Sequence, residues 1–449
     1  MKNTKFSYLA LIIIHALIAM AVFVVPFLSK IYSALILIIG FGIVYQTRNR
    51  NNEVLLVAAY LVGAEVFLRM TGGNFNNEYV KFAVTFFMLM GMFYSNFFSN
   101  GLIYCFFLVL LVPGILITTA VSDPSIDIKK ALFFNLSGPV CLAVTSLYTI
   151  KRNILFSDFQ NIIIAIGMPI ITTTVYLFLY NPSVKDVITG TQSNFETSGG
   201  FGPNQVSTIL GLGMFVFFSQ LMLFSKSKKL IILNASLLIF ISYRALVTFS
   251  RGGVITGVAM ICCLLFFLYH SSNGKGRSKF VVIFAMTALI GVGVWTYSYF
   301  QTSGLIEKRY ANKDAIGREK KDRLGGREVI MDAEIKLFLN DPVLGVGVGL
   351  SKYKRLELMK EEAASHNEIT RMLCEHGIFG IFGLLILFVT PFILYLNNRQ
   401  HLYFLSCFIF WLLTINHAAM RTAAPAFVYA LCLLSVKIKI PEKKQNADS

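Results

Sequence analysis

About fourteen long apolar runs constrain the fold of this chain more than any other feature of its sequence. They lie at about 7–28, 31–45, 54–69, 80–98, 102–120, 131–150, 162–180, 206–225, 230–249, 252–270, 280–300, 378–397, 402–419 and 422–438. A helix needs about 20 apolar residues to cross the hydrocarbon core of a bilayer. The second and third runs are short, so the sequence predicts an all-α polytopic membrane bundle with about 12 to 14 spans.

The composition excludes a soluble enzyme and a disordered chain. Of 449 residues, 56% are hydrophobic and 14% are charged, whereas soluble domains average about 25% charged residues. The net charge of +17 is explained by cytoplasmic loops that face an anionic leaflet, and we expect no nucleic-acid partner. The seven cysteines lie in or beside apolar runs, which favours buried thiols over a disulfide framework or a zinc site.

The distribution of Lys and Arg between alternate loops predicts the orientation. With both termini in the cytoplasm, the cytoplasmic loops hold Lys228 and Arg277, and most other basic loop residues follow the same parity. Arg251 and His366 then lie on the opposite side. We therefore expect a multi-pass membrane protein with a cytoplasmic and a non-cytoplasmic face.

This parity also places one long polar segment outside, which divides the chain into three regions. An N-terminal bundle (1–300) precedes a loop outside the membrane (301–377), and C-terminal spans with a cytoplasmic tail follow (378–449). Apolar residues at helical spacing predict a loop helix over Arg327–Leu339, and a second, charged helix is expected over Ser351–Ala364. Ser365 is the predicted N-cap of a third helix, with Glu368 at the capping-box position.

Two arginines lie where an anion could bind. Arg251 precedes Gly252 and Gly253 in the turn between two spans, where a guanidinium and backbone N–H groups can converge on phosphate. A tight turn with a snorkelling arginine is an equal alternative. Arg327 opens the predicted loop helix, and a helix N-terminus favours anions. Among so many charges, a merely solvated Arg327 is the simpler interpretation.

Other candidates are a histidine and the charged residues within spans. His366 starts a helix in a polar setting, where it could accept a hydroxyl proton or bind phosphate. It could equally be an exposed residue of the cap, and His376 is its competitor. Arg244 lies two helical turns before Arg251, and a buried arginine suggests either function or a structural contact between helices. Glu65 and Arg69 have the spacing of a local ion pair.

An ordered set of motifs resembles the O-antigen ligase and polymerase superfamily over about 200–395. The motifs are Gly202-Pro203-Asn204, Thr-x-Ser-Arg-Gly-Gly at 248–253, Gly326-Arg327, the run Asp341-Pro342-Val343-Leu344-Gly345-Val346-Gly347, His366-Asn367 and Glu375-His376-Gly377. The resemblance implies a membrane C-type glycosyltransferase that takes a glycan from a polyprenyl-diphosphate donor. It further implies a multi-pass protein of the bacterial inner membrane whose active site faces the periplasm, so that the loop 301–377 is periplasmic. It also implies a glycolipid or glycan acceptor, and a reaction without metal or cofactor.

Carried over by motif, the resemblance implies that Arg251 and Arg327 hold the diphosphate and that His366 orients or deprotonates the acceptor hydroxyl. We add Arg244, Asn204 and Asn367 as predicted substrate-binding residues. The absence of a DxD motif and of any cluster with metal-ligand spacing agrees with metal-independent transfer.

Several functions remain open at this point. The preferred one is an O-antigen ligase with a lipid A-core acceptor. An O-antigen polymerase that joins lipid-linked repeats, or a protein O-oligosaccharyltransferase, would share the same motifs. The non-enzyme alternative is a polysaccharide transporter or flippase, in which Arg244 and Glu65 would line a central path.

Overall fold

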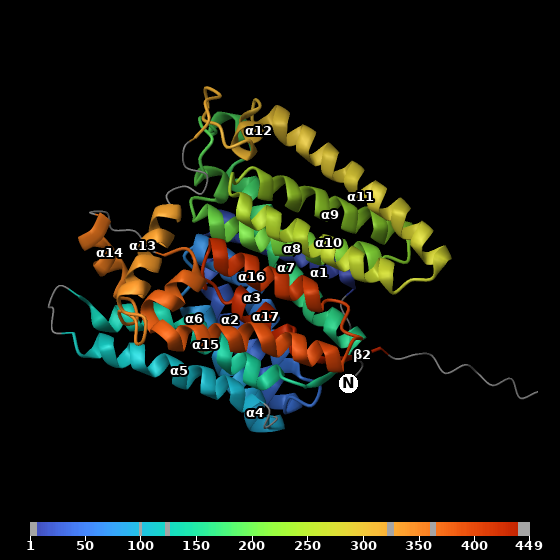
Figure 1. The fold of residues 1–449 in the computed structure, drawn as a ribbon. Helices are drawn as coiled ribbons and strands as arrows, with labels where there is room; N and C mark the ends of the chain where they lie inside the picture. The colour runs from blue at the N-terminus through green and yellow to red at the C-terminus, as the bar shows by residue number, and fades with distance from the viewer. Residues whose placement is uncertain (1–6, 98–100, 122–125, 321–326, 360–364, 439–449) are drawn as a thin grey trace, which may run out of the picture.

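A computed structural model describes residues 7–97, 101–121, 126–320, 327–359 and 365–438, which fold almost entirely as helices (Figure 1). The helices are α1 (Tyr8–Val24), α2 (Leu28–Thr47), α3 (Glu53–Met70), α4 (Tyr79–Ser95), α5 (Leu102–Thr119), α6 (Ile128–Thr149), α7 (Phe156–Tyr180), α8 (Pro203–Leu223), α9 (Lys228–Leu246), α10 (Arg251–His270), α11 (Gly274–Gln301), α12 (Leu305–Tyr310), α13 (Arg327–Asn340), α14 (Ser351–Met359), α15 (Glu368–Asn397), α16 (Phe404–His417) and α17 (Ala424–Leu431). Two three-residue strands, β1 (Asn153–Leu155) and β2 (Ser435–Lys437), pair in parallel.

The predicted class of fold is confirmed. Within the described residues, nine helices are long and apolar enough to cross a membrane, and α1, α4 and α16 are shorter apolar helices. The predicted runs at 54–69 and 422–438 correspond to α3 and α17. The protein is therefore a polytopic all-α membrane protein.

The helices run between two ends of the bundle. At one end, α12, α13 and α14 gather, and at the other the β1–β2 pair joins the chain before α7 to the chain after α17 (Figure 1). Lys228 and the Gly274 turn start helices that lead toward the α12–α14 end, whereas Arg251 starts a helix that leads away from it. Lys228 and the Gly274 turn thus lie at the end of the bundle opposite to Arg251, as the charge pattern predicts. Which end faces the periplasm stays a prediction.

The ion pair between Arg69 and the buried Glu65 fixes the turn before α17. Arg69 donates to Glu65 at 2.8 Å, as its spacing predicts, and also to the backbone oxygen of Arg421 at 3.0 Å. The other carboxylate oxygen of Glu65 accepts from the backbone N–H of Ala423 at 2.7 Å. Both side chains therefore bind the backbone of this turn, which indicates a structural role for the pair.

The glycine motifs of the sequence mark places where backbones approach closely. A Cβ atom on Gly253 would lie 2.1 Å from backbone atoms of Ser207, so α10 crosses α8 in direct backbone contact. At Gly377 the backbone has φ +57° and kinks α15, and a Cβ there would lie 2.5 Å from the carbonyl oxygen of Val343. The segment before α14 thereby docks on the kink, where Val346 donates to the backbone oxygen of Cys374 at 2.9 Å.

Gly253→Ala is expected to destabilise the α8–α10 crossing. Its Cβ would overlap backbone atoms that have no rotamer by which to move away, and overpacking of this kind costs on the order of 3 kcal/mol. Thermal unfolding of the purified protein in detergent measures the effect. Gly291→Ala in α11 is the matched control, because a Cβ there meets nothing within 4 Å. Equal stability of the two variants would contradict the crossing.

Candidate active site

The turn between α9 and α10 presents Arg251 at the α12–α14 end of the bundle. Phe249 has φ +58°, which is unfavourable for a bulky residue. Arg309 stabilises this turn, since its Nε donates to the backbone oxygen of Phe249 at 2.9 Å and its Nη2 to Ser193 Oγ at 3.3 Å. Arg251 donates in turn to the backbone oxygen of Arg309 at 3.4 Å. The two guanidinium groups are thus brought side by side.

Arg327 and Arg421 extend this positive region. Arg327 is the first residue of α13, which confirms the predicted loop helix, while its motif partner Gly326 lies outside the described residues. Burial, together with the charges of Arg251 and Arg327, lowers the pKa of Arg309. Burial and the charges of Arg327 and Arg371 lower the pKa of Arg421. We call Arg251, Arg309, Arg327 and Arg421 the basic cluster, because these like charges act on one another.

His366 shares a small cavity with Arg327. The cavity has a volume of about 90 Å³ and is lined by Arg327, Ile330, Met331, His366, Asn367, Asn416 and His417. Two residues that the sequence singled out are therefore brought together, although 39 positions separate them in the chain. The cavity is large enough for a few water molecules or a small polar group.

His417 is a cavity residue that sequence reasoning missed. Its Nδ1 donates to the backbone oxygen of Leu413 at 2.7 Å, and its Nε2 lies 3.1 Å from Thr208 Oγ1. A Cβ on Gly252 would lie 2.5 Å from the imidazole ring. The glycine pair after Arg251 therefore makes room for His417 and for α8, which is a packing role.

Asn367, and not Ser365, caps the helix that follows His366. The side-chain oxygen of Asn367 accepts from the backbone N–H of Ile369 at 2.8 Å and of Thr370 at 3.4 Å, so the predicted Ser365 cap is wrong. Ser365 instead donates to Glu334 on α13 at 3.3 Å. The predicted substrate-binding role of Asn367 therefore coexists with a capping role that fixes the position of His366.

Glu334 joins α13, α14 and α15 behind this segment. It accepts from Arg355 at 2.5 Å and from Thr370 at 2.6 Å. Burial raises the pKa of Glu334, and the bonds to Thr370 and Arg355 oppose that shift. Because this α13 carboxylate binds groups on α14 and α15, it holds the start of α13, with Arg327, and the segment before α15, with His366, in a fixed relation.

Asn204 contacts the residue before Arg251, whereas Arg244 lies outside the basic cluster. The side-chain oxygen of Asn204 accepts from Ser250 Oγ at 2.8 Å, so Asn204 braces the residue before Arg251. Arg244 is fully buried and donates to the backbone oxygens of Asn181 at 3.2 Å and Thr197 at 2.8 Å. Its guanidinium therefore holds the loop between α7 and α8, and the structure does not bring it into the basic cluster.

Arg244→Ala is expected to lower stability rather than to weaken substrate binding. Hydrogen bonds to charged groups contribute about 1.5–3 kcal/mol each, and the loop would lose two anchors. Unfolding temperature in detergent and protease cleavage within 181–202 measure the loss. Lys185→Ala, an exposed cation in the same loop, is the control. Normal stability with weakened donor binding would return Arg244 to the substrate site.

His376 lies away from the cavity. It is 3% exposed, and its Nδ1 would lie 2.7 Å from a Cβ on Gly114 of α5. Its surroundings are those of a buried packing residue. Of the two histidines that the sequence offered, only His366 therefore shares a cavity with an arginine of the basic cluster.

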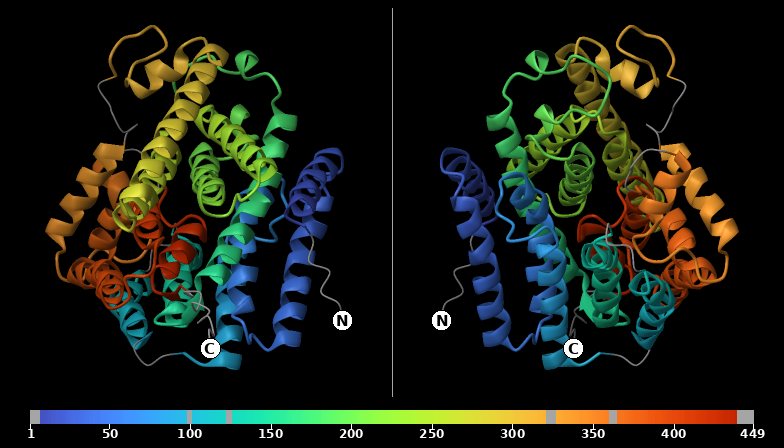
Figure 2. Two further views of the ribbon diagram at one scale, coloured as in Figure 1. Left: turned by 90° about the vertical axis from the view of Figure 1, so that its right-hand side faces the viewer. Right: turned by 90° about the vertical axis from the view of Figure 1, so that its left-hand side faces the viewer.

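An apolar groove leads along α9, α10 and α11 toward the basic cluster. Its volume is about 640 Å³, and its lining includes Val258, Ala288, Gly291 and Trp295. Figures 1 and 2 show α11 on the outside of the bundle, beside α9 and α10. Tyr310 also lines the groove, and it is the neighbour of Arg309 in the chain.

Tyr310 marks the polar end of this groove. Its hydroxyl is buried and has no hydrogen-bond partner among the described residues. Burial raises the pKa of Tyr310, while the charges of Arg251 and Arg309 act in the opposite direction. A buried phenol without a partner requires an explanation. A polar group of a ligand at this point would provide one.

In the part of the chain that the structure describes, no group of three or more His, Cys, Asp or Glu residues could hold a metal ion. Metal-independent transfer stays a prediction, which chelation tests below.

The comparisons with known proteins address the family. Residues 235–385 match a family model described as O-antigen ligase. No curated protein and no solved structure matches the chain. The matched region holds Arg251, Arg309, Arg327 and His366, and it includes the whole of α10 to α14. The motifs of the sequence and the polytopic helical fold agree with this match, and the region 235–385 of the chain is similar to the O-antigen ligase family.

Proposed function

We propose that the protein transfers a glycan from a polyprenyl-diphosphate donor to a hydroxyl of a lipid A-core acceptor at the periplasmic face, as an O-antigen ligase does. One observation carries the proposal. The apolar groove of α9–α11 ends at Tyr310 and the basic cluster, and the cluster leads to His366. The polyprenyl tail of the donor would lie in the groove, its diphosphate at the basic cluster, and its reacting sugar beside His366.

The basic cluster would bind the diphosphate. Guanidinium groups form paired hydrogen bonds to phosphate oxygens. Negative charge on the diphosphate grows as the bond to the sugar breaks, and fixed cations in a site of restricted water stabilise that charge most strongly at the transition state. The hydroxyl of Tyr310 would donate a further hydrogen bond to the same group.

The transfer step involves one bond formed and one broken. The acceptor oxygen forms a bond to the anomeric carbon of the donor, and the bond from that carbon to the diphosphate oxygen breaks. The electron pair of the broken bond stays on the diphosphate. The proton of the acceptor hydroxyl passes to His366, which lines the cavity beside Arg327.

Ala288→Trp is expected to obstruct the groove. Ala288 lines it, so an indole there would occupy space meant for the polyprenyl tail. The KM for a long-chain donor should rise about tenfold or more, and the KM for a donor with a short chain should change little. Leu289→Trp is the matched control, since Leu289 is 73% exposed on the neighbouring face of α11. Equal effects of both variants would remove the groove from the donor site.

The proposal is tested with purified protein, a lipid-linked glycan and lipid A-core. Glycan transfer and release of polyprenyl diphosphate should occur in equal amounts and should persist in excess EDTA. Loss of transfer in EDTA, with rescue by a divalent ion, would overturn the metal-free reaction. Movement of the donor across the membrane without release of polyprenyl diphosphate would indicate a transporter.

Electrophoresis of surface glycan from a deletion strain separates ligase from polymerase. Loss of all attached chains is expected for a ligase. A single attached repeat would instead identify a polymerase, with the same donor chemistry at the same site.

A further inference from the structure

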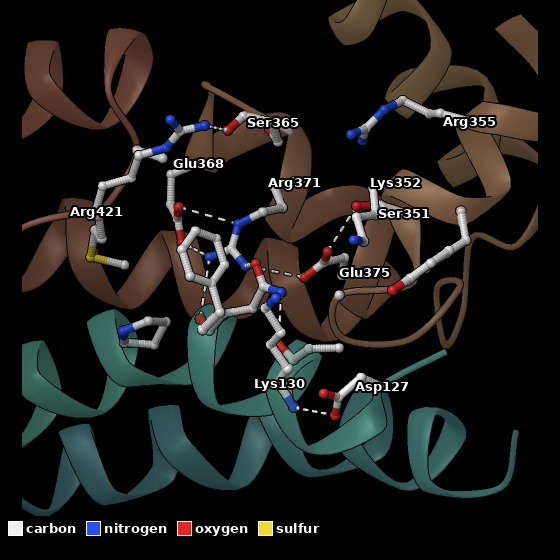
Figure 3. A pocket seen from close by; sticks show the side chains of 18 residues that line it. Asp127, Lys130, Ser351, Lys352, Arg355, Ser365, Glu368, Arg371, Glu375 and Arg421 are labelled. Atoms are coloured by element: carbon white, nitrogen blue, oxygen red, sulfur yellow. Dashed lines mark hydrogen bonds and ion pairs between the residues drawn. The ribbon is translucent and has the colours of Figure 1, made fainter. Parts of the chain in front are cut away.

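A second cavity lies on the other side of the His366 segment. Its volume is about 280 Å³, and it lies between α6, α14, the start of α15 and the turn that contains Arg421 (Figure 3). Ser365 lines this cavity, whereas His366 and Asn367 line the cavity that contains Arg327. The two cavities are thus lined by neighbouring residues of one short segment. We call this space the α6–α15 cavity.

The polar wall of the α6–α15 cavity is held in a fixed arrangement. Arg371 donates to the side-chain oxygen of Asn135 at 2.7 Å, to Glu375 at 3.2 Å and to Glu368. Ser351 donates to the other oxygen of Glu375 at 2.8 Å. Figure 3 shows Ser351 of α14 and Glu368, Arg371 and Glu375 of α15 around the cavity. Pre-oriented carboxylate, amide and guanidinium groups can each bind neighbouring hydroxyls of a polyol.

Aromatic side chains form an apolar part of the cavity lining, in addition to the polar wall. Phe134 and Tyr353 line the cavity, and Phe134 is 47% exposed although α6 packs on the bundle. An aromatic face carries partial negative charge and attracts the polarised C–H groups of a sugar ring. The cavity volume lies near the lower end of the roughly 300–1,000 Å³ found for small-molecule sites. These features fit a single sugar ring.

The position of the α6–α15 cavity indicates which sugar it binds. Arg421 lines the cavity and donates to the backbone oxygen of Ser365 at 3.2 Å, and the charge of Arg327 acts on it. The cavity thus shares Arg421 with the basic cluster, but it is formed by other helices than the groove of α9–α11. A donor in the groove and a sugar in this cavity would therefore approach the His366 segment between different helices.

We infer that the α6–α15 cavity binds a sugar residue of the acceptor and directs its hydroxyl toward His366. The inference rests on the proposed transfer reaction and names the acceptor subsite within it. Lys130 lies at the rim of the cavity and can donate to ring substituents of the bound sugar.

Two pairs of variants test the inference. Phe134→Ala and Lys130→Ala each change a residue that lines the cavity, whereas Phe133→Ala and Lys129→Ala change exposed neighbours on α6 that do not line it. The first pair should raise the KM for the acceptor about tenfold and leave the KM for the donor near that of the control pair. A rise in the KM for the donor alone would assign the cavity to the donor glycan. No difference between the pairs would overturn the inference.

A binding measurement separates this inference from the proposed function. Core oligosaccharide freed of its acyl chains is titrated into the full-length protein in detergent and followed by calorimetry. Saturable binding that Phe134→Ala weakens and Phe133→Ala does not would support the cavity as a glycan site, even if the wild-type protein transferred nothing. Binding that is absent, or equally strong in both variants, would overturn it.

Discussion

Arg327→Ala and Arg251→Ala are each expected to lower kcat for glycan transfer by about 10²–10³, the usual effect of removing one fixed donor that stabilises developing negative charge. Both residues belong to the basic cluster, and Arg327 also lines the cavity with His366. The leaving diphosphate gains charge as its bond to the sugar breaks, so the loss should appear in kcat as well as in KM. Initial rates at saturating donor and acceptor measure it.

Lysine at the same positions should restore only part of the rate. An ammonium group supplies the charge but cannot form the paired hydrogen bonds of a guanidinium. Arg318→Ala is the control, since Arg318 lies in the same segment with its side chain 76% exposed and paired with Asp314. A near-normal rate for Arg327→Ala or Arg251→Ala, at matched protein levels, would remove that residue from the diphosphate site.

His366→Ala is expected to lower kcat by about 10²–10⁴, because a positioned general base contributes that range. The side chain lines the cavity beside Arg327 and precedes α15, so the variant should insert and unfold like the wild-type protein. The rate of transfer at saturating substrates and the unfolding temperature are the two measurements.

His376→Ala provides the comparison. His376 is buried against Gly114 on α5, and its replacement should lower stability more than the rate per folded molecule. If His376→Ala were folded but inactive while His366→Ala retained its activity, the catalytic role would move to His376 and the cavity beside Arg327 would lose its assigned function.

The sequence predicted those parts of the fold that depend on local pattern. Apolar run length located the spans, and three- and four-residue spacing located α13 with Arg327 at its start. The predicted ion pair between Glu65 and Arg69 was also correct, because both residues lie one turn apart on the same helix. The Ser365 cap was wrong because tertiary contact with Glu334 engaged that hydroxyl and left Asn367 to cap the helix.

The residues that sequence reasoning missed depend on long-range contacts. Arg309 lies in a stretch that looked merely charged and polar, and only its bonds to Phe249 and Ser193 identify it as part of the cluster. His417 looked like one residue of an apolar span, and it reaches the cavity because Gly252 leaves space for its ring. No local pattern marks such positions.

The α6–α15 cavity could not be predicted for the same reason. Arg371 and Asn135, which meet in its wall, are 236 positions apart. Arg244 is the opposite case. The sequence pattern suggested a substrate-binding residue, and in the structure its guanidinium binds backbone oxygens of a loop. Burial and helical spacing drew attention to it, and the carbonyl oxygens that it binds belong to a loop about 50–60 residues away.

An experimental structure of the protein with polyprenyl diphosphate bound, determined by electron cryomicroscopy, tests the central claim most directly. We predict that the tail lies in the groove of α9–α11 and that the diphosphate lies within hydrogen-bond distance of Arg251, Arg327 and Tyr310. The terminal phosphate should face the cavity that contains His366. A diphosphate bound instead beside Arg371 in the α6–α15 cavity, or a tail outside the groove, would contradict the account.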